Sequence, residues 1–162
     1  MKTLEKAVIH SPKLMTQTRV YRRQSVKKIA VIITRGGWNN LFQACEWVTL
    51  AAASGMEVSA YFRDEAASRM TTTKIKELTM SPDYRGREAF VRDLLKKENK
   101  ADLTKIMQTA KETGSVKFSV CKDSLRYFDL KVEELIPELD EVQTTEAFWK
   151  EAILPADQVL TF

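Results

Sequence analysis

Histidine is almost missing from this sequence of 162 residues. The single histidine, His10, lies close to the start of the chain, before the apolar segments that would build a core. A histidine activates the nucleophile in most serine and cysteine hydrolases, and cysteines and histidines together are the usual ligands of structural zinc. We therefore expect neither a histidine-dependent hydrolase nor a zinc centre, and we predict no metal site.

Cysteine is scarce too, and long hydrophobic runs are missing. Two cysteines, Cys45 and Cys121, do not make the disulfide framework of small secreted domains. The longest apolar stretches, Ile29–Ile33 and Val48–Ala53, are far shorter than the ~20 residues that cross a bilayer. The first thirty residues contain no apolar segment of the secretory type. From these absences we expect a cytoplasmic protein that does not enter a membrane.

The net charge of +4 is unevenly distributed along the chain. Residues 1–28 contain eight Lys or Arg and one acid, a net +7, whereas the rest contains 18 basic and 21 acidic residues, a net −3. A basic segment can bind nucleic acid or an acidic partner, but no aromatic stacking motif accompanies these charges, so we do not expect nucleic-acid binding. We predict a basic N-terminal extension over residues 1–26 and one domain over residues 27–162.

From Lys27 onward, apolar segments alternate between strand and helix patterns. Lys28–Ile33 is a continuous β-branched run, typical of a parallel strand that is covered on both faces. Apolar residues from Leu41 to Ala52 then recur at helical spacing, and Met56–Phe62 has the pattern of a second strand. A strand, a helix and a strand of these lengths form a βαβ unit.

The rest of the chain continues the alternation. Asn39 or Asn40 is expected to cap the first helix. The further expected elements are helices over Arg87–Lys97 and Leu103–Thr113, a strand over Val116–Val120, short helices over Asp123–Phe128 and Val132–Ile136, a small strand at Glu141–Val142, a helix over Glu146–Ala152 and a last strand over Gln158–Phe162. Alternating strands and helices predict an α/β domain, with helices on both faces of a mostly parallel sheet of about five strands.

Cys121 is the candidate nucleophile. Ligand sites in parallel sheets form at the carboxyl ends of the strands, where the loops 34–40, 63–68 and 121–124 should meet. A cysteine directly before a helix lies near unpaired backbone amides and the positive end of the helix dipole. This environment favours the thiolate and lowers the cysteine pKa from its usual ~8.5.

Several neighbouring residues support a substrate site at this edge. Lys122 would add positive charge, and Ser124 could donate a hydrogen bond to a thiolate or to an attached sulfur. Gly36 and Gly37 allow a close turn whose amides could hold an anion, although their spacing is not that of a phosphate-binding or dinucleotide-binding motif. The predicted substrate-binding residues are Arg35, Gly36, Gly37, Arg63, Lys122 and Ser124.

Two alternatives to a nucleophilic Cys121 stay open. Free cysteines commonly pack as small hydrophobes, which is also our interpretation of Cys45 on the apolar face of the first helix. With a structural Cys121, the cleft near Gly36 and Gly37 would be that of a small-molecule or nucleotide-binding module. The other alternative is a peroxiredoxin-like thiol redox protein, although no peroxide-activating threonine and arginine accompany Cys121.

Several segments resemble one known family. Leu103–Cys121, with the sequence LTKIMQTAKETGSVKFSVC, is similar to the helix–glycine–strand–cysteine segment of the DsrE/DsrF-like sulfur-relay proteins, which include the DsrE/TusD-like sulfur carriers. Phe128–Ile136, Thr144–Trp149 and Ala156–Phe162 resemble the end of these proteins, and Ala51–Val58 fits their opening βαβ unit.

The resemblance covers roughly residues 27–162 and carries expectations about function. It implies a three-layer α/β/α fold, a homo-oligomer such as a trimer or hexamer, and no cofactor. It also implies that Cys121 holds sulfane sulfur as a persulfide or thiosulfonate. The protein would then be a cytoplasmic sulfur carrier or sulfurtransferase subunit that passes sulfur to a TusA-like or rhodanese-like partner. The segment 69–100 is not explained by the pattern of the family.

Overall fold

The computed structural model describes residues 27–162, and residues 1–26, the predicted basic extension, lie outside the described residues. Five strands form one sheet in the order β4-β3-β2-β1-β5, and every neighbouring pair is parallel. The strands are β1 (Lys28–Ile33), β2 (Glu57–Phe62), β3 (Val116–Cys121), β4 (Glu141–Gln143) and β5 (Gln158–Thr161). This sheet confirms the predicted α/β class.

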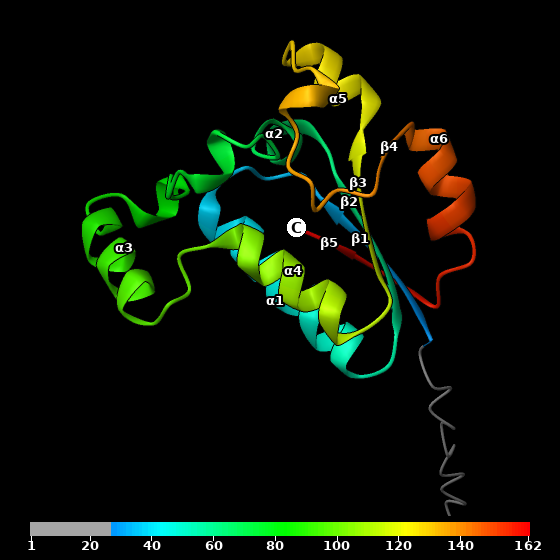
Figure 1. Cartoon of the computed structure of the whole chain (residues 1–162), viewed down its shortest axis with the longest axis horizontal. Coiled ribbons are helices and arrows are strands. Elements are labelled where there is room, and N and C mark those ends of the chain that lie inside the picture. The colour runs from blue at the N-terminus through cyan, green and yellow to red at the C-terminus, as the bar shows by residue number, and fades with distance from the viewer. Residues whose placement is uncertain (1–26) are drawn as a thin grey trace, which may run out of the picture.

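Helices cover both faces of the sheet. α1 and α4 lie side by side on one face, and α6 lies on the opposite face (Figure 1). The helices are α1 (Trp38–Ala53), α2 (Asp64–Ser68), α3 (Glu88–Lys97), α4 (Leu103–Thr113), α5 (Lys122–Tyr127) and α6 (Thr145–Phe148), which continues as the π-helical turn η4 (Trp149–Ile153). The 3-10 turns are η1 (Lys74–Lys76), η2 (Pro82–Tyr84) and η3 (Val132–Glu134). The predicted three-layer α/β/α arrangement is therefore present.

β1 is a continuous apolar run because both of its faces are covered. Ile29, Val31 and Ile33 join the large hydrophobic core under α1 and α4. Ala30 belongs to a small cluster on the opposite face, which α6 covers. Successive side chains of a strand alternate between the faces of its sheet, so the same alternation sorts the residues of the other strands between the two clusters.

The face covered by α6 changes character along the strands. Near the start of the strands it carries ion pairs, with Lys28 3.0 Å from Glu57 and Lys117 2.7 Å from Glu141. Toward the carboxyl ends it becomes apolar, around the buried ring of Phe148. α6 and η4 are short and cover only part of this face. The strands therefore carry a continuous apolar surface only on the other face, where α1 and α4 pack.

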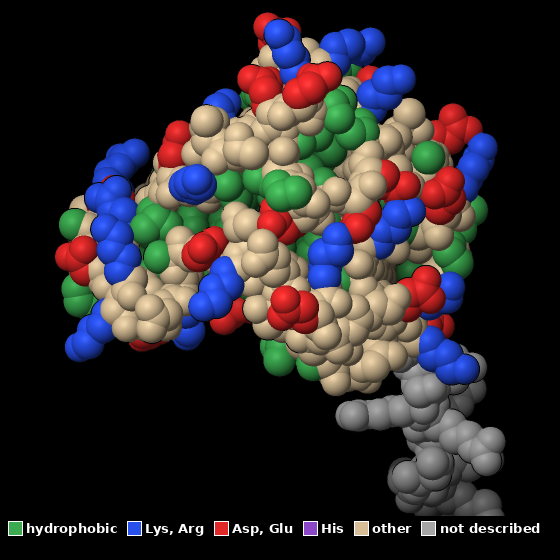
Figure 2. All heavy atoms as spheres, viewed as in Figure 1, with side chains coloured by type: hydrophobic (Ala, Val, Ile, Leu, Met, Phe, Trp, Pro, Cys, Tyr) green, Lys and Arg blue, Asp and Glu red, His purple; other side chains and the backbone are tan. Residues whose placement is uncertain are grey.

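α3 extends away from the rest of the structure, and basic side chains gather over it (Figures 1 and 2). None of its residues is buried. Phe90 and Leu94 are largely exposed, whereas Val91 and Leu95 pack against the core. None of the helices in residues 27–162 combines the length and the apolar composition of a membrane-spanning helix.

The first helix begins earlier than its predicted caps. Trp38 is its first residue and Gly37 its N-cap, so Asn39 and Asn40 lie inside the first turn. The N–H of Trp38 donates to the carbonyl of Thr79 over 2.7 Å. This contact with a distant segment satisfies one of the amides that have no partner within the first turn of the helix, and sequence pattern alone does not reveal it.

The helix predicted over Val132–Ile136 is a single 3-10 turn, η3. After this turn, Leu135 forms an antiparallel bridge with Thr71, and the N–H of Ile136 donates to the carbonyl of Met70 over 3.0 Å. These long-range backbone bonds replace the helical ones, so tertiary pairing overrides the local pattern.

Gly114 is required by the close approach of two backbones. A Cβ atom at this position would lie 2.7 Å from the carbonyl oxygen of Ala52 in α1, and backbone atoms cannot rotate away. We predict that Gly114→Ala lowers the free energy of unfolding by about 1–3 kcal/mol, as overpacking does in other cores, measured by urea unfolding. The matched control is Ser115→Ala, because Ser115 is exposed. Equal midpoints for the two variants would contradict the prediction.

Candidate functional site

Cys121 is the last residue of β3 and directly precedes α5. Its neighbour Val120 lies in the large core, so the alternation of the strand directs Cys121 to the face covered by α6, where it packs with Tyr61 and Phe148. Only 2% of its surface is exposed. The cysteine therefore stands, as predicted, between a buried strand and a short helix.

Hydrogen-bond donors surround the sulfur of Cys121. Burial is the largest effect on this thiol and raises its pKa. Hydrogen bonds from the hydroxyls of Ser124 and Tyr61 and from the backbone N–H groups of Ser124 and Asp123 together outweigh burial, so the pKa of Cys121 is lowered from its ordinary value. Such donors stabilise the thiolate much more than the thiol. The arrangement therefore favours the nucleophilic form of the cysteine.

A hydrogen bond between two loops orients Ser124. The backbone N–H of Asp64 donates to Ser124 Oγ over 2.8 Å, which leaves the hydroxyl proton of Ser124 free to donate to Cys121. Asp64 has a φ of 51°, a left-handed conformation that is costly for residues other than glycine. The hydrogen bond from this strained turn joins the loop 63–68 to the loop 121–124. These are two of the three loops that we predicted to meet.

Tyr61 is a site residue that the sequence prediction misses. Its ring stacks on Phe148, with 4.5 Å between the ring centroids. Burial and then the hydrogen bond to Cys121 raise the pKa of Tyr61, so the phenol stays protonated and can act as a donor. The sequence does contain an indication of this role. Tyr61 is the penultimate residue of the second predicted strand, and the carboxyl ends of parallel strands, including that of the Cys121 strand, share one edge of the sheet.

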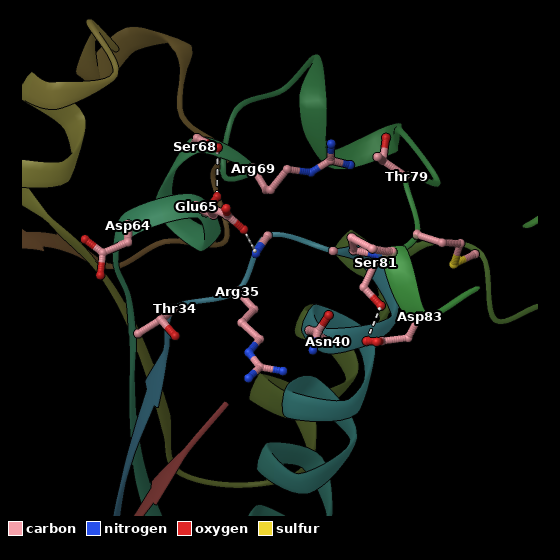
Figure 3. A pocket seen from close by; sticks show the side chains of 14 residues that line it. Thr34, Arg35, Asn40, Asp64, Glu65, Ser68, Arg69, Thr79, Ser81 and Asp83 are labelled. Carbon is pink, nitrogen blue, oxygen red and sulfur yellow. Dashed lines mark hydrogen bonds between the residues drawn. The ribbon is translucent and has the colours of Figure 1, made fainter. Parts of the chain in front are cut away.

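A separate cavity of about 680 Å³ lies at the carboxyl end of β1 (Figure 3). The predicted residues Arg35, Gly36 and Gly37 line it, and Cys121 does not. The other lining residues are Thr34, Asn40, Asp64, Glu65, Ser68, Arg69, Thr79, Met80, Ser81, Pro82 and Asp83. The edge of the sheet thus carries two distinct places for chemistry where the sequence predicts one.

Packing between loops explains why glycines occupy positions 36 and 37. A Cβ atom at Gly36 would lie 2.9 Å from the carbonyl oxygen of Glu65, and one at Gly37 would lie 2.8 Å from the side-chain oxygen of Asn40. The N–H of Gly36 donates to the Glu65 carboxylate over 3.3 Å. The Glu65 carboxylate therefore already accepts a hydrogen bond from one of the backbone amides that we predicted would bind an anion.

Arg69 is a second residue that the sequence prediction misses. It lines the 680 Å³ cavity and is only 8% exposed. Its Nη1 donates to the Glu77 carboxylate over 2.9 Å and its Nη2 to the Glu77 carbonyl, while its Nε has no partner among the described residues. Hydrophobic periodicity does not signal a buried arginine in a polar segment such as this one.

Arg63 and Lys122 lie at the starts of α2 and α5. Arg63 directly precedes α2, and its positive charge opposes part of the rise in the pKa of Tyr61. Lys122 is exposed at the start of α5 and lines a surface groove of about 560 Å³. Of the predicted substrate-binding residues, Ser124 is therefore the one whose side chain bonds to Cys121.

The second cysteine lies in the core. Cys45 is on the buried side of α1, and burial raises its pKa to about 12. Its thiol is therefore protonated near neutral pH, in agreement with the predicted packing role. Within the part of the chain that the structure describes, no group of three His, Cys, Asp or Glu residues is placed to hold a metal ion.

The sequence model of the DsrE/DsrF/DrsH-like family matches residues 47–158, more than half of the chain. The chain belongs to this family. The match includes Tyr61, Cys121 and Ser124 and begins after Gly36 and Gly37. Membership confirms the resemblance seen in the sequence and assigns the chain a fold of the sulfur-relay type.

A solved structure shares the fold. It is a protein of unknown function, MTH1491, from Methanobacterium thermoautotrophicum. The match has a TM-score of 0.53 and 10% sequence identity, and it covers 84% of this chain and 99% of that chain. At this identity the similarity supports the three-layer architecture alone. A search of the curated proteins finds no match.

The lowered pKa of Cys121 leads to a prediction about its reactivity. In a Cys45→Ala variant, where Cys121 is the remaining cysteine, the iodoacetamide alkylation rate should rise with pH and reach half-maximum below the ordinary thiol value of ~8.5. The thiolate also contributes folding stability above the pKa of the unfolded chain, and this contribution is lost as pH falls through the lower folded pKa. A midpoint at or above 8.5 would refute the prediction.

The contribution of Ser124 can be measured separately. Ser124→Ala removes one donor to the Cys121 thiolate and leaves the Asp64 N–H without its acceptor, so we predict a higher alkylation midpoint for Cys121 and a loss of about 1–3 kcal/mol in unfolding free energy. The matched control is Ser119→Ala, because Ser119 is a buried serine of β3 on the same face as Cys121 and its hydroxyl bonds to the Ala60 carbonyl. An unchanged midpoint in Ser124→Ala would remove Ser124 from the site.

Proposed function

We propose that this protein carries sulfane sulfur on Cys121 and transfers it to a second protein. The observation that carries the proposal is the set of hydrogen-bond donors around the Cys121 sulfur, which favour an anionic sulfur despite its burial. The family, with its sulfur-relay type of fold, supports the same assignment. A sulfur carrier needs a thiolate that attacks sulfane sulfur and an environment that then holds a charged persulfide.

Loading of the carrier is a thiol exchange that needs no added oxidant. The Cys121 thiolate attacks the outer sulfur of a donor persulfide or polysulfide, a new sulfur–sulfur bond forms on Cys121, and the sulfur–sulfur bond of the donor breaks. The donor leaves as a thiolate and takes up a proton from water. Transfer to the acceptor is the same step in reverse, with the acceptor thiolate as the nucleophile.

A persulfide fits this site better than a thiosulfonate does. The groups that lower the pKa of Cys121, from Ser124, Tyr61 and the start of α5, act on one sulfur atom. A thiosulfonate would bring a bulky sulfonate with three further oxygens. Arg35, the candidate cation for such a group, lines the 680 Å³ cavity, and Cys121 does not.

The acceptor we propose is a small sulfur carrier of the TusA-like or rhodanese-like kind, in the cytoplasm. Because only 2% of Cys121 is exposed, the acceptor has to present its own thiolate at the carboxyl edge of the sheet. We also propose that the chain forms a homo-oligomer, a trimer or hexamer. Large exposed apolar side chains support such contacts, notably Trp47 and Leu50 on α1, Trp149 on η4 and Leu154 directly after it.

A second candidate function is binding of a small molecule in the 680 Å³ cavity. The observation in its favour is Arg69, which is buried, lines the cavity and has an Nε without a partner among the described residues. An unsatisfied buried donor is costly, and an acceptor atom of a ligand would satisfy it. In this case Cys121 would have a packing role.

The test is the intact mass of the reduced protein after incubation with polysulfide, thiosulfate or tetrathionate. We predict that polysulfide adds sulfur atoms, about 32 Da each, to the wild-type protein and to Cys45→Ser but not to Cys121→Ser, because the Cys121 thiolate is the nucleophile. An adduct that dithiothreitol removes would confirm a persulfide. No adduct from any donor would contradict the carrier function and favour the second candidate.

A further inference from the structure

The Tyr61 hydroxyl lies among three possible hydrogen-bond partners. It donates to the carbonyl oxygen of Gln143 over 3.3 Å and lies 3.4 Å from Thr145 Oγ1. Tyr61 also packs with Cys121 in one buried cluster, and Gln143 is the partner of Cys121 in the register of the sheet. The ring is 1% exposed and stacked on Phe148, which limits its movement. The hydroxyl therefore changes partner by rotation of its proton and not by displacement of the ring.

A phenol has one proton to donate, and two of the neighbours compete for it. The Gln143 carbonyl can only accept, and an anionic sulfur on Cys121 can only accept. Thr145 is different, because its hydroxyl can donate to the Tyr61 oxygen whichever acceptor the tyrosine serves. Hydrogen bonds to charged acceptors are roughly twice as strong as neutral ones, so the charge on the sulfur decides where the proton goes.

We propose that Tyr61 is a positioning residue for sulfur transfer whose hydroxyl donates to Cys121 when the sulfur is anionic, as thiolate or persulfide, and to the Gln143 carbonyl when it is neutral. The inference rests on the proposed function. Gln143 ends β4, and Thr145 is the first residue of α6. The hydrogen bonds of Tyr61 thereby connect the charge on the cargo to the residues at the start of α6.

Each element that neighbours Tyr61 and Cys121 contributes a charged group. Arg63, before α2, acts on Tyr61 by its positive charge. Asp123, in the first turn of α5, follows Cys121 by two residues, and its carboxylate lies 3.5 Å from Arg126. Glu151, on η4, accepts a hydrogen bond of 2.9 Å from the side chain of Gln143. None of these charged groups can supply the neutral hydroxyl donor that Tyr61 offers to the sulfur.

The test compares Tyr61→Phe with Tyr127→Phe, both in a Cys45→Ala background. Tyr127 is on α5, directly after Arg126, and 71% exposed, so its substitution controls for loss of a nearby phenol. We expect Tyr61→Phe to raise the alkylation midpoint of Cys121 by about one pH unit, a tenfold weaker acid, as loss of a hydrogen bond to a charged group predicts. Tyr127→Phe should leave the midpoint unchanged.

Two further readouts keep the inference testable. The persulfide of Tyr61→Phe should pass its outer sulfur to dithiothreitol several-fold more slowly than that of the parent Cys45→Ala variant, because a less acidic Cys121 is a poorer leaving group. If Tyr61→Phe does not fold, NMR of the Cys45→Ala variant with tyrosine labelled with carbon-13 at Cζ provides the test. One tyrosine resonance should shift with pH at the alkylation midpoint of Cys121. The same resonance should stay constant when Cys121 is also changed to Ser.

The outcomes separate this inference from the proposed function. An unchanged midpoint in Tyr61→Phe, or no tyrosine resonance that follows Cys121, would overturn the inference even if the wild-type protein forms a persulfide. A raised midpoint without any persulfide from polysulfide would overturn the proposed function and would leave Tyr61 as a partner of a plain thiolate.

Discussion

The alternation of side chains along β3 decides where the chemistry of this protein lies. Val120 enters the core under α1 and α4, and Cys121 turns to the face covered by α6. A slip of one residue would exchange the two faces and bury the sulfur in the large hydrophobic core instead of beside Tyr61. The parallel ladder that places Phe62 beside Val120 therefore fixes both the fold and the environment of the sulfur.

Segments with a strong hydrophobic period were predictable from sequence, and the connections between β2 and α3 were not. The predicted bounds Lys28–Ile33 and Leu103–Thr113 coincide with β1 and α4, because a β-branched run and a clear helical spacing have no local competitor. Between β2 and α3 the backbone is held by distant partners. The bridge from Thr71 to Leu135 is one example, and no local pattern encodes it.

The residues of the candidate site also fall into those predictable from local sequence and those placed by tertiary contacts. Cys121 and Ser124 are three residues apart, so their proximity follows from the strand–helix junction alone. Asp64, which orients Ser124, is 60 residues away, and Tyr61 reaches the sulfur through the register of the sheet. Gly36 was assigned to an anion site from residue type, but the Glu65 carboxylate that occupies its amide arrives by tertiary packing. Sequence placed the candidate nucleophile at its strand–helix junction, and the groups that surround it needed coordinates.

The near-complete burial of Cys121 has a consequence for selectivity in the cell. A persulfide on an open surface loses its outer sulfur to any free thiol that diffuses past, and small thiols are abundant in reducing compartments. A sulfur with 2% exposure is shielded from such encounters by Tyr61 and Phe148. If Cys121 carries sulfur as proposed, this confinement would slow the loading of the sulfur as well as its loss, and it would restrict delivery to a protein whose shape fits the edge of the sheet.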